Sequence, residues 1–193
     1  MPTSRSATTP PEAELRAALA AALDLLAAVP DGTVRVPAVG TDVSGVVAHV
    51  AGCLSWYAHD LVAGPAGADA HTVDPRPDAD LGERLTGLRA WGEVLARTVA
   101  LSPPGEVGAH SDGPPDATGF AALGCAELLL HTDDVADALG LPWAPPESAV
   151  GLVLDRLFPD VAGDEDPWSL LRWATGRADL PGRDVRTSWS YRV

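Results

Sequence analysis

The stretch DATGFAALGCAELLLHTDDVADALG, residues 116–140, decides the fold of this 193-residue chain. Asp116 is a typical helix-capping residue and Gly140 a typical helix stop, and apolar side chains recur between them at helical spacing. At about 100° per residue, one stripe of this helix contains Phe120, Leu123, Gly124, Glu127, His131, Asp134 and Ala138. We therefore predict a long helix whose inward face carries a carboxylate and an imidazole.

Three earlier segments show the same amphipathic periodicity. They cover about residues 11–29, 42–63 and 80–100, and the first begins with an apparent capping box, Thr9 to Glu12. Four helices of roughly 18–24 residues, each with one apolar face, are typical of a four-helix bundle. The fold class that we predict is all-α.

The last part of the chain has a different pattern. Two short helical segments are followed by strict alternation at Val185, Thr187, Trp189, Tyr191 and Val193. Alternation with period two predicts a strand, and residues 33–36 are its one good partner in the chain. We expect a disordered N-terminus over 1–10, a bundle domain over 11–144, and an appendage over 145–193 that packs on the bundle with two helices and a strand.

Composition excludes several classes of function. The chain has 27 acidic and 13 basic residues, a formal net charge of −14, and no lysine. So negative a surface repels nucleic-acid backbones and anionic membranes, and the lack of lysine excludes P-loop and Schiff-base chemistry. We expect neither a nucleic-acid nor a membrane partner.

Cysteine usage and targeting signals indicate the compartment. The two cysteines, Cys53 and Cys125, do not make a disulfide framework, and no N-terminal segment has the pattern of a signal peptide. The alanine-rich stretch 17–29 contains Asp24 and is too short to span a membrane. The prediction is a cytoplasmic protein with reduced thiols.

The candidate site is a metal centre inside the bundle. A buried carboxylate needs a partner, and bundles build metal sites from Glu–His pairs joined by ligands on neighbouring helices. Besides Glu127 and His131, the obvious third ligand is His49, at the edge of the apolar stripe of its helix. Two imidazoles and one carboxylate leave an open position, as in catalytic zinc sites. Asp134 and Cys53 are candidates for contacts behind the ligands.

Simpler interpretations remain for each of these residues. Glu127 and His131 also fit an ordinary ion pair one helical turn apart. His49 alone also fits a half-buried histidine with its hydrogen bonds made, and Cys53 fits a small core residue. Cys125 lies off the stripe of Glu127 and His131, and we assign it no role.

Two stretches resemble a known family. The segments DVSGVVAHVAG (42–52) and AELLLHTDDVADALGLPW (126–143) are similar to the mycothiol-dependent maleylpyruvate isomerase N-terminal-domain family, which belongs to the DinB-like metalloproteins. The segment WATGRADLPGR (173–183) resembles a stretch of its actinobacterial members, and the resemblance extends over about residues 12–190. The missing lysine, asparagine, glutamine and isoleucine also suit a high-GC actinobacterial source, in which mycothiol is made.

This resemblance implies a bundle with a long crossover and a divalent metal, zinc or nickel, held by His49, Glu127 and His131. It also implies a metal-activated low-molecular-weight thiol, mycothiol or bacillithiol, that reacts with an electrophile in isomerisation or S-transfer. Two features depart from the family. Val39-Gly40 stand where the family often has a tryptophan, and the 45 or so C-terminal residues are too few for the second domain of the isomerase.

Two other hypotheses compete with a thiol-using enzyme. One is a bundle that keeps the metal as a structural or sensing element, or that has lost it. The other is an interaction module that forms a homodimer through a bundle face or through the C-terminal strand. A substrate-sized cavity at converged ligands favours the enzyme, whereas ligand tips more than about 6 Å apart exclude a metal site.

Overall fold

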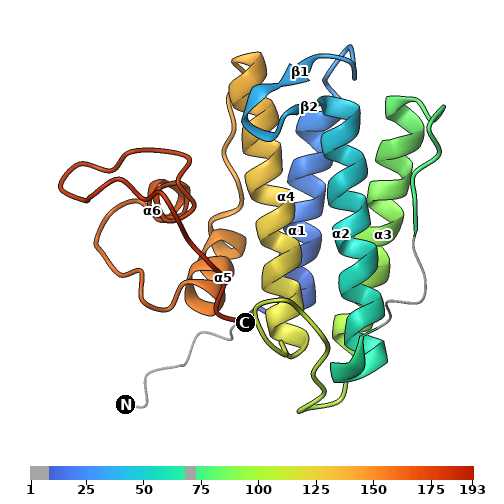
Figure 1. Ribbon diagram of the computed structural model, residues 1–193, viewed down its shortest axis with the longest axis vertical. Helices are drawn as coiled ribbons and strands as arrows, with labels where there is room; N and C mark the ends of the chain where they lie inside the picture. Colours follow the sequence, from blue (N-terminus) through green and yellow to red (C-terminus); the bar gives the residue numbers. More distant parts are fainter. Residues whose placement is uncertain (1–8, 68–72) are drawn as a thin grey trace, which may run out of the picture.

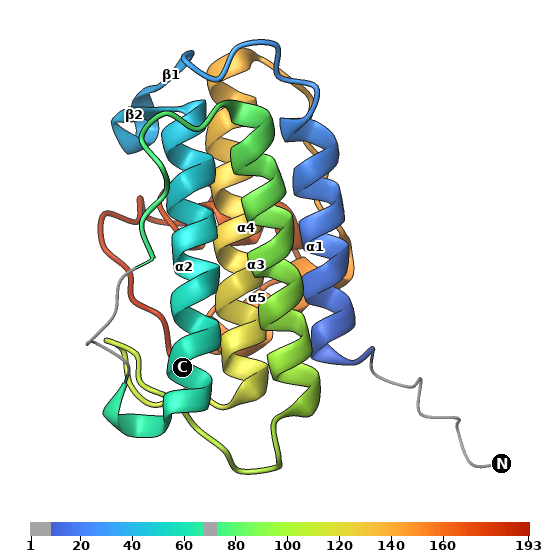
Figure 2. The same ribbon diagram turned by 90° about the vertical axis from the view of Figure 1, so that its right-hand side faces the viewer.

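Four long helices lie side by side in the computed structural model, which describes residues 9–67 and 73–193 (Figure 1). They are α1 (Pro11–Leu26), α2 (Val43–Ala63), α3 (Leu81–Leu101) and α4 (Ala117–Leu139). Helices α2 and α3 run in the same direction, so the chain between them returns along the length of the molecule (Figures 1 and 2). This mostly helical structure is compatible with the predicted all-α bundle.

Aspartate side chains cap the first turns of three of these helices. Asp42 accepts a hydrogen bond from the Gly45 amide, and Asp116 accepts one from the Gly119 amide. Asp80 forms a full capping box with Glu83 at the start of α3. Each such cap stabilises its helix by about 1 kcal/mol, because an otherwise unpaired amide gains an acceptor. The capping box expected at Thr9 is wrong, since α1 has Pro10 as its cap and no side chain that accepts a hydrogen bond there.

The four helices meet at Gly124. A Cβ atom at this position would lie 2.9 Å from a methyl carbon of Leu15 and 2.9 Å from one of Leu95. It would also lie 3.2 Å from a methyl carbon of Leu54. These three leucines come from α1, α3 and α2, and all are fully buried. A residue larger than glycine at this position would force these leucine side chains to shift.

A small hairpin covers the start of α2. Strands β1 (Arg35–Val36) and β2 (Thr41–Asp42) pair antiparallel, and the 3-10 turn η1 (Pro37–Val39) connects them. Gly40 closes the turn with a left-handed backbone, φ 71°. The strand predicted at 33–36 therefore exists only over two residues, and its partner is the neighbouring segment rather than the C-terminus.

The predicted strand at 185–193 is wrong. These residues form no strand and lie against the helix α5 (Glu147–Leu157), where the Arg192 amide donates to the Leu157 carbonyl at 3.0 Å. The rings of Trp189 and Tyr191 pack on Phe158, with centroids 6.0 and 5.6 Å away. Aromatic packing thus takes the place of strand pairing in this part of the chain.

The remaining C-terminal segment packs on α4. Helix α5 contributes Val150 and Leu157 to the core that the long helices share, and α6 (Pro167–Ala174) packs on α5. Arg172 of α6 donates to Asp133 of α4 at 2.8 Å.

Disorder was predicted for the N-terminal residues 1–10, of which residues 1–8 lie outside the described part of the chain. No described helix combines the length and apolar character that a membrane crossing requires.

Candidate metal centre

Helices α2 and α4 bring the three predicted ligands together. His49 lies on α2 beside the buried Val46 and Val50, which hold this part of the helix against α4. Glu127 and His131 lie one turn apart on α4. The potential ligand atoms of all three side chains lie within 4.8 Å of one another, well inside the limit beyond which no metal site could exist.

The individual separations fit a common central ion. Glu127 Oε2 lies 3.5 Å from His49 Nε2 and 3.4 Å from His131 Nε2. Two ligands bound at about 2.1 Å in tetrahedral geometry are about 3.4 Å apart. The two imidazole rings are perpendicular to each other, with centroids 5.0 Å apart.

One oxygen of the Glu127 carboxylate accepts a hydrogen bond and the other does not. Its Oε1 accepts a hydrogen bond from the Tyr57 hydroxyl at 3.2 Å. Its Oε2 is buried and, within residues 9–67 and 73–193, has no hydrogen-bond partner, although both imidazoles are near. A buried carboxylate oxygen without a partner is costly, and a cation between the three side chains would satisfy it.

Burial and neighbouring charges shift the pKa values of Glu127 and His131 so that the carboxylate is ionised and the imidazole is protonated. Burial raises the pKa of Glu127, but the adjacent His131 and His49 outweigh it and hold the pKa below its ordinary value. Burial lowers the pKa of His131, but Asp134 and Glu127 outweigh it and raise that pKa to about 9. In the absence of a metal, a proton on His131 therefore supplies the positive charge.

Asp134 contacts His131 from three positions further along α4. Its Oδ2 is 3.0 Å from His131 Nδ1, and only 6% of the Asp134 side chain is exposed. A carboxylate accepts hydrogen bonds, so Nδ1 carries a proton and Nε2 is left to act as a ligand. Such carboxylate–histidine pairs orient metal ligands in many metal sites.

Cys53 lies beside His49 but outside the cluster of three. Its Sγ is 3.7 Å from His49 Nε2 and the residue is half-buried. Burial and the Glu127 charge raise the pKa of this thiol, so it is a neutral thiol rather than a reactive thiolate. Cys125 is fully buried in the core.

A cavity opens over the exposed side of the cluster. It has a volume of about 440 Å³ and is lined by Val39, Thr41, Gly45, Val46, His49 and His131. Solvent reaches the three side chains from the side of His49. The His49 side chain is 55% exposed, whereas those of Glu127 and His131 are 12% and 17% exposed. The hairpin that precedes α2 forms one wall of this cavity.

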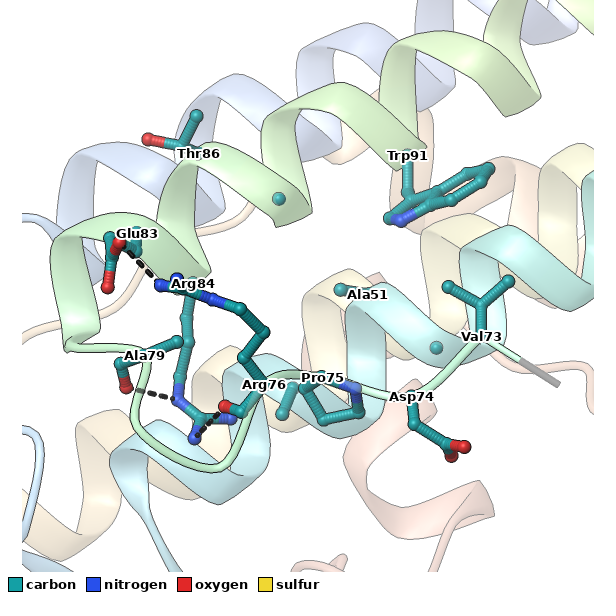
Figure 3. Close-up of a pocket in the computed structure, with 13 residues that line it drawn as sticks. Ala51, Val73, Asp74, Pro75, Arg76, Ala79, Glu83, Arg84, Thr86 and Trp91 are labelled. Atoms are coloured by element: carbon teal, nitrogen blue, oxygen red, sulfur yellow. Dashed lines mark hydrogen bonds and ion pairs between the residues drawn. The ribbon is translucent and has the colours of Figure 1, made fainter.

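Another cavity, of about 430 Å³, lies between α2 and α3 (Figure 3). Trp91 lines one end of it, and Arg84 and Arg76 line the other. Both arginines are engaged locally, since Arg84 donates to the Ala79 carbonyl and Arg76 to Glu83. None of the three predicted ligands lines this cavity.

Sequence reasoning missed three residues near the site. Tyr57 belongs to the apolar stripe of its helix, but its hydroxyl donates a hydrogen bond to Glu127. The sequence signal that could have identified it is its position eight residues, about two helical turns, after His49. Tyr191 comes from the C-terminal tail, where burial and the charge of Glu127 raise its pKa. Arg177 donates to Asp134 from 43 residues away, and no local spacing could reveal that contact.

Comparison with known proteins gives no match to any family model, curated protein or solved structure.

Proposed function

We propose that this chain is a DinB-like four-helix bundle that binds a divalent metal and uses it to activate a low-molecular-weight thiol. His49, Glu127 and His131 would hold the metal, with zinc the first choice for two imidazoles and a carboxylate. The observation that carries the proposal is the convergence of two Nε2 atoms on the unpartnered, buried Oε2 of Glu127 at 3.4 and 3.5 Å.

The resemblance to the mycothiol-dependent family supplies the substrate class in this proposal. The parallel course of α2 and α3 supports it, since such a course needs the long crossover that the family has (Figure 1). The co-substrate would be mycothiol or a similar thiol, and the second substrate a small electrophile. We place the protein in the cytoplasm, where such thiols are kept reduced.

The bound metal would lower the pKa of a coordinated thiol so that it reacts as a thiolate. The chain's own residues perform the supporting tasks. Glu127 contributes the negative charge that balances the cation, and Tyr57 holds that carboxylate in place. Asp134 keeps the proton on Nδ1 of His131.

The shape of the site favours an enzyme over a structural metal site. A structural zinc site is closed by four protein ligands, whereas three ligands beside an open cavity leave room for a substrate. Here the cavity of about 440 Å³ contacts two of the three ligands, His49 and His131. Its size suits a small molecule rather than a polypeptide.

A thiol-transfer assay tests this function. The protein, loaded with zinc or nickel, is mixed with mycothiol and a panel of electrophiles, and loss of the free thiol is followed over time. We expect turnover that a chelator abolishes and that added metal restores. Metal bound in stoichiometric amount without turnover of any electrophile would contradict the enzyme and favour the structural or sensing alternative.

A further inference from the structure

Arg177 reaches the metal site from outside the four long helices. It follows α6, and its Nε and Nη2 donate to the two oxygens of Asp134, each at 3.0 Å. Only 18% of the Arg177 side chain and 6% of the Asp134 side chain are exposed. A buried, two-pronged arginine–carboxylate pair is strong and fixes the orientation of the carboxylate.

The same carboxylate contacts the proposed ligand. Asp134 Oδ2, which accepts from Arg177, also lies 3.0 Å from His131 Nδ1. Since Arg177 holds both oxygens, the carboxylate cannot turn away from the imidazole. A continuous chain of contacts thus leads from the C-terminal segment to Nε2 of His131, which faces Glu127.

We propose that Arg177 is a positioning residue of the metal centre: through Asp134 it fixes the ring orientation and tautomer of His131. The segment over 145–193 is then part of the site and not only a cover for the bundle. The consequence for metal affinity rests on the proposed function, whereas the effect on the His131 tautomer does not.

The competing explanation is that Arg177 only docks the C-terminal segment on α4. Arg172 offers the matched control, because it also pairs with α4 acids from that segment. It donates to Asp133 at 2.8 Å and to Asp137 at 2.5 Å, and neither acid contacts His131 in the described chain. A pure docking role would make the two arginines equivalent.

The experiment compares R177M, R177K and R172M with the wild type. Zinc affinity is measured by competition with a chromogenic chelator, and the coordination geometry by the visible spectrum of the cobalt-loaded protein. Loss of contacts behind a ligand typically weakens metal affinity 10- to 100-fold, roughly, so we expect at least a tenfold loss for R177M. R172M should stay within about twofold of the wild type, and its cobalt spectrum should be unchanged, because its contacts end at Asp133 and Asp137.

R177K keeps the charge but not the two-pronged contact, so we expect a loss of about threefold or more. It also decides the matter if R177M does not fold. Wild-type affinity in R177K, or an equal loss in R177M and R172M, would overturn the positioning role.

A readout without metal separates this inference from the proposed function. The ¹⁵N NMR shifts of His131 are recorded in metal-free protein at a pH above its pKa of about 9. The wild type and R172M should show the proton on Nδ1 of His131. The variants R177M and R177K should show a mixture of tautomers. If the wild type binds no metal, the proposed function fails, while an unchanged tautomer in R177M would separately overturn the role of Arg177.

Discussion

Glu127 Oε2 lies 3.5 Å from His49 Nε2, although the two residues belong to different helices and are 78 positions apart. The contact joins α2 to α4 at the one place where a buried carboxylate oxygen has no hydrogen-bond partner in the described chain. The separations of 3.5 Å to His49 Nε2 and 3.4 Å to His131 Nε2 are those of ligands around one tetrahedral ion, and the metal centre proposed above rests on them.

The Tyr57 hydroxyl should tune the metal centre without forming it. Y57F removes the hydrogen bond to Glu127 Oε1 and keeps the ring that packs against Phe120, with centroids 6.0 Å apart. A hydrogen bond to a charged group contributes about 1.5–3 kcal/mol. We expect a metal affinity lowered roughly tenfold or more, measured by chelator competition. Unchanged affinity would show that Glu127 needs no support from Tyr57.

Metal affinity should rise with pH. His131 must lose its proton to bind a metal, and its pKa is raised to about 9 in the metal-free protein. Below that pH the proton competes, so affinity should increase about tenfold per pH unit from pH 7 to 9 and then level off. Isothermal titration at several pH values measures this, and an affinity independent of pH in this range would contradict the assignment of His131.

Metal-free protein should lose stability in the same range. The pKa of His131 is 6.5 in a model peptide and about 9 when folded, so its contribution is complete below pH 6.5. That contribution is lost as the pH rises through about 9. Urea unfolding of chelated and zinc-saturated protein between pH 6 and 10 tests this prediction, because only the chelated form should show the fall.

The approach of the four helices should depend on Gly124. In G124V the new side chain would meet Leu15 and Leu95, whose methyl carbons already lie 2.9 Å from a Cβ at this position. Overpacking of this kind costs about 1–3 kcal/mol of unfolding free energy. The control is G52A, since a Cβ at Gly52 meets no atom within 4 Å and should stabilise α2 by roughly 0.5–1 kcal/mol. Thermal unfolding of both variants is the measurement, and equal effects would contradict the packing at Gly124.

The long helices were predictable from the sequence because their signals are local. Apolar periodicity and the caps Asp42, Asp80 and Asp116 lie within the helices they define or directly before them. The strand predicted at the C-terminus does not exist, because alternation alone does not make a strand unless another segment pairs with it. Residues 35–36 pair with residues five to seven positions away, which costs little loop entropy, and the tail packs its aromatic rings on Phe158 instead.

In the candidate site, too, the residues with local sequence signals were predictable and those with distant contacts were not. Helical geometry placed Glu127, His131 and Asp134 in one stripe, and the structure brings His49 to that stripe from α2. Arg177 escaped prediction because its contact with Asp134 depends on how the C-terminal segment folds back on α4. Local spacing identifies residues that share a helix face, but not those that reach it from elsewhere.

The metal content of the purified protein tests most directly whether His49, Glu127 and His131 hold a metal. It is measured by elemental analysis for the wild type, H49A, E127Q, H131A and H59A. His59 is the matched control, because it lies on α2 with His49 but contacts Trp56 and Trp91 instead of Glu127. We expect about one divalent ion per chain in the wild type and H59A, and strong loss in the other three variants. No metal in the wild type after zinc loading, or equal content in all five proteins, would contradict it.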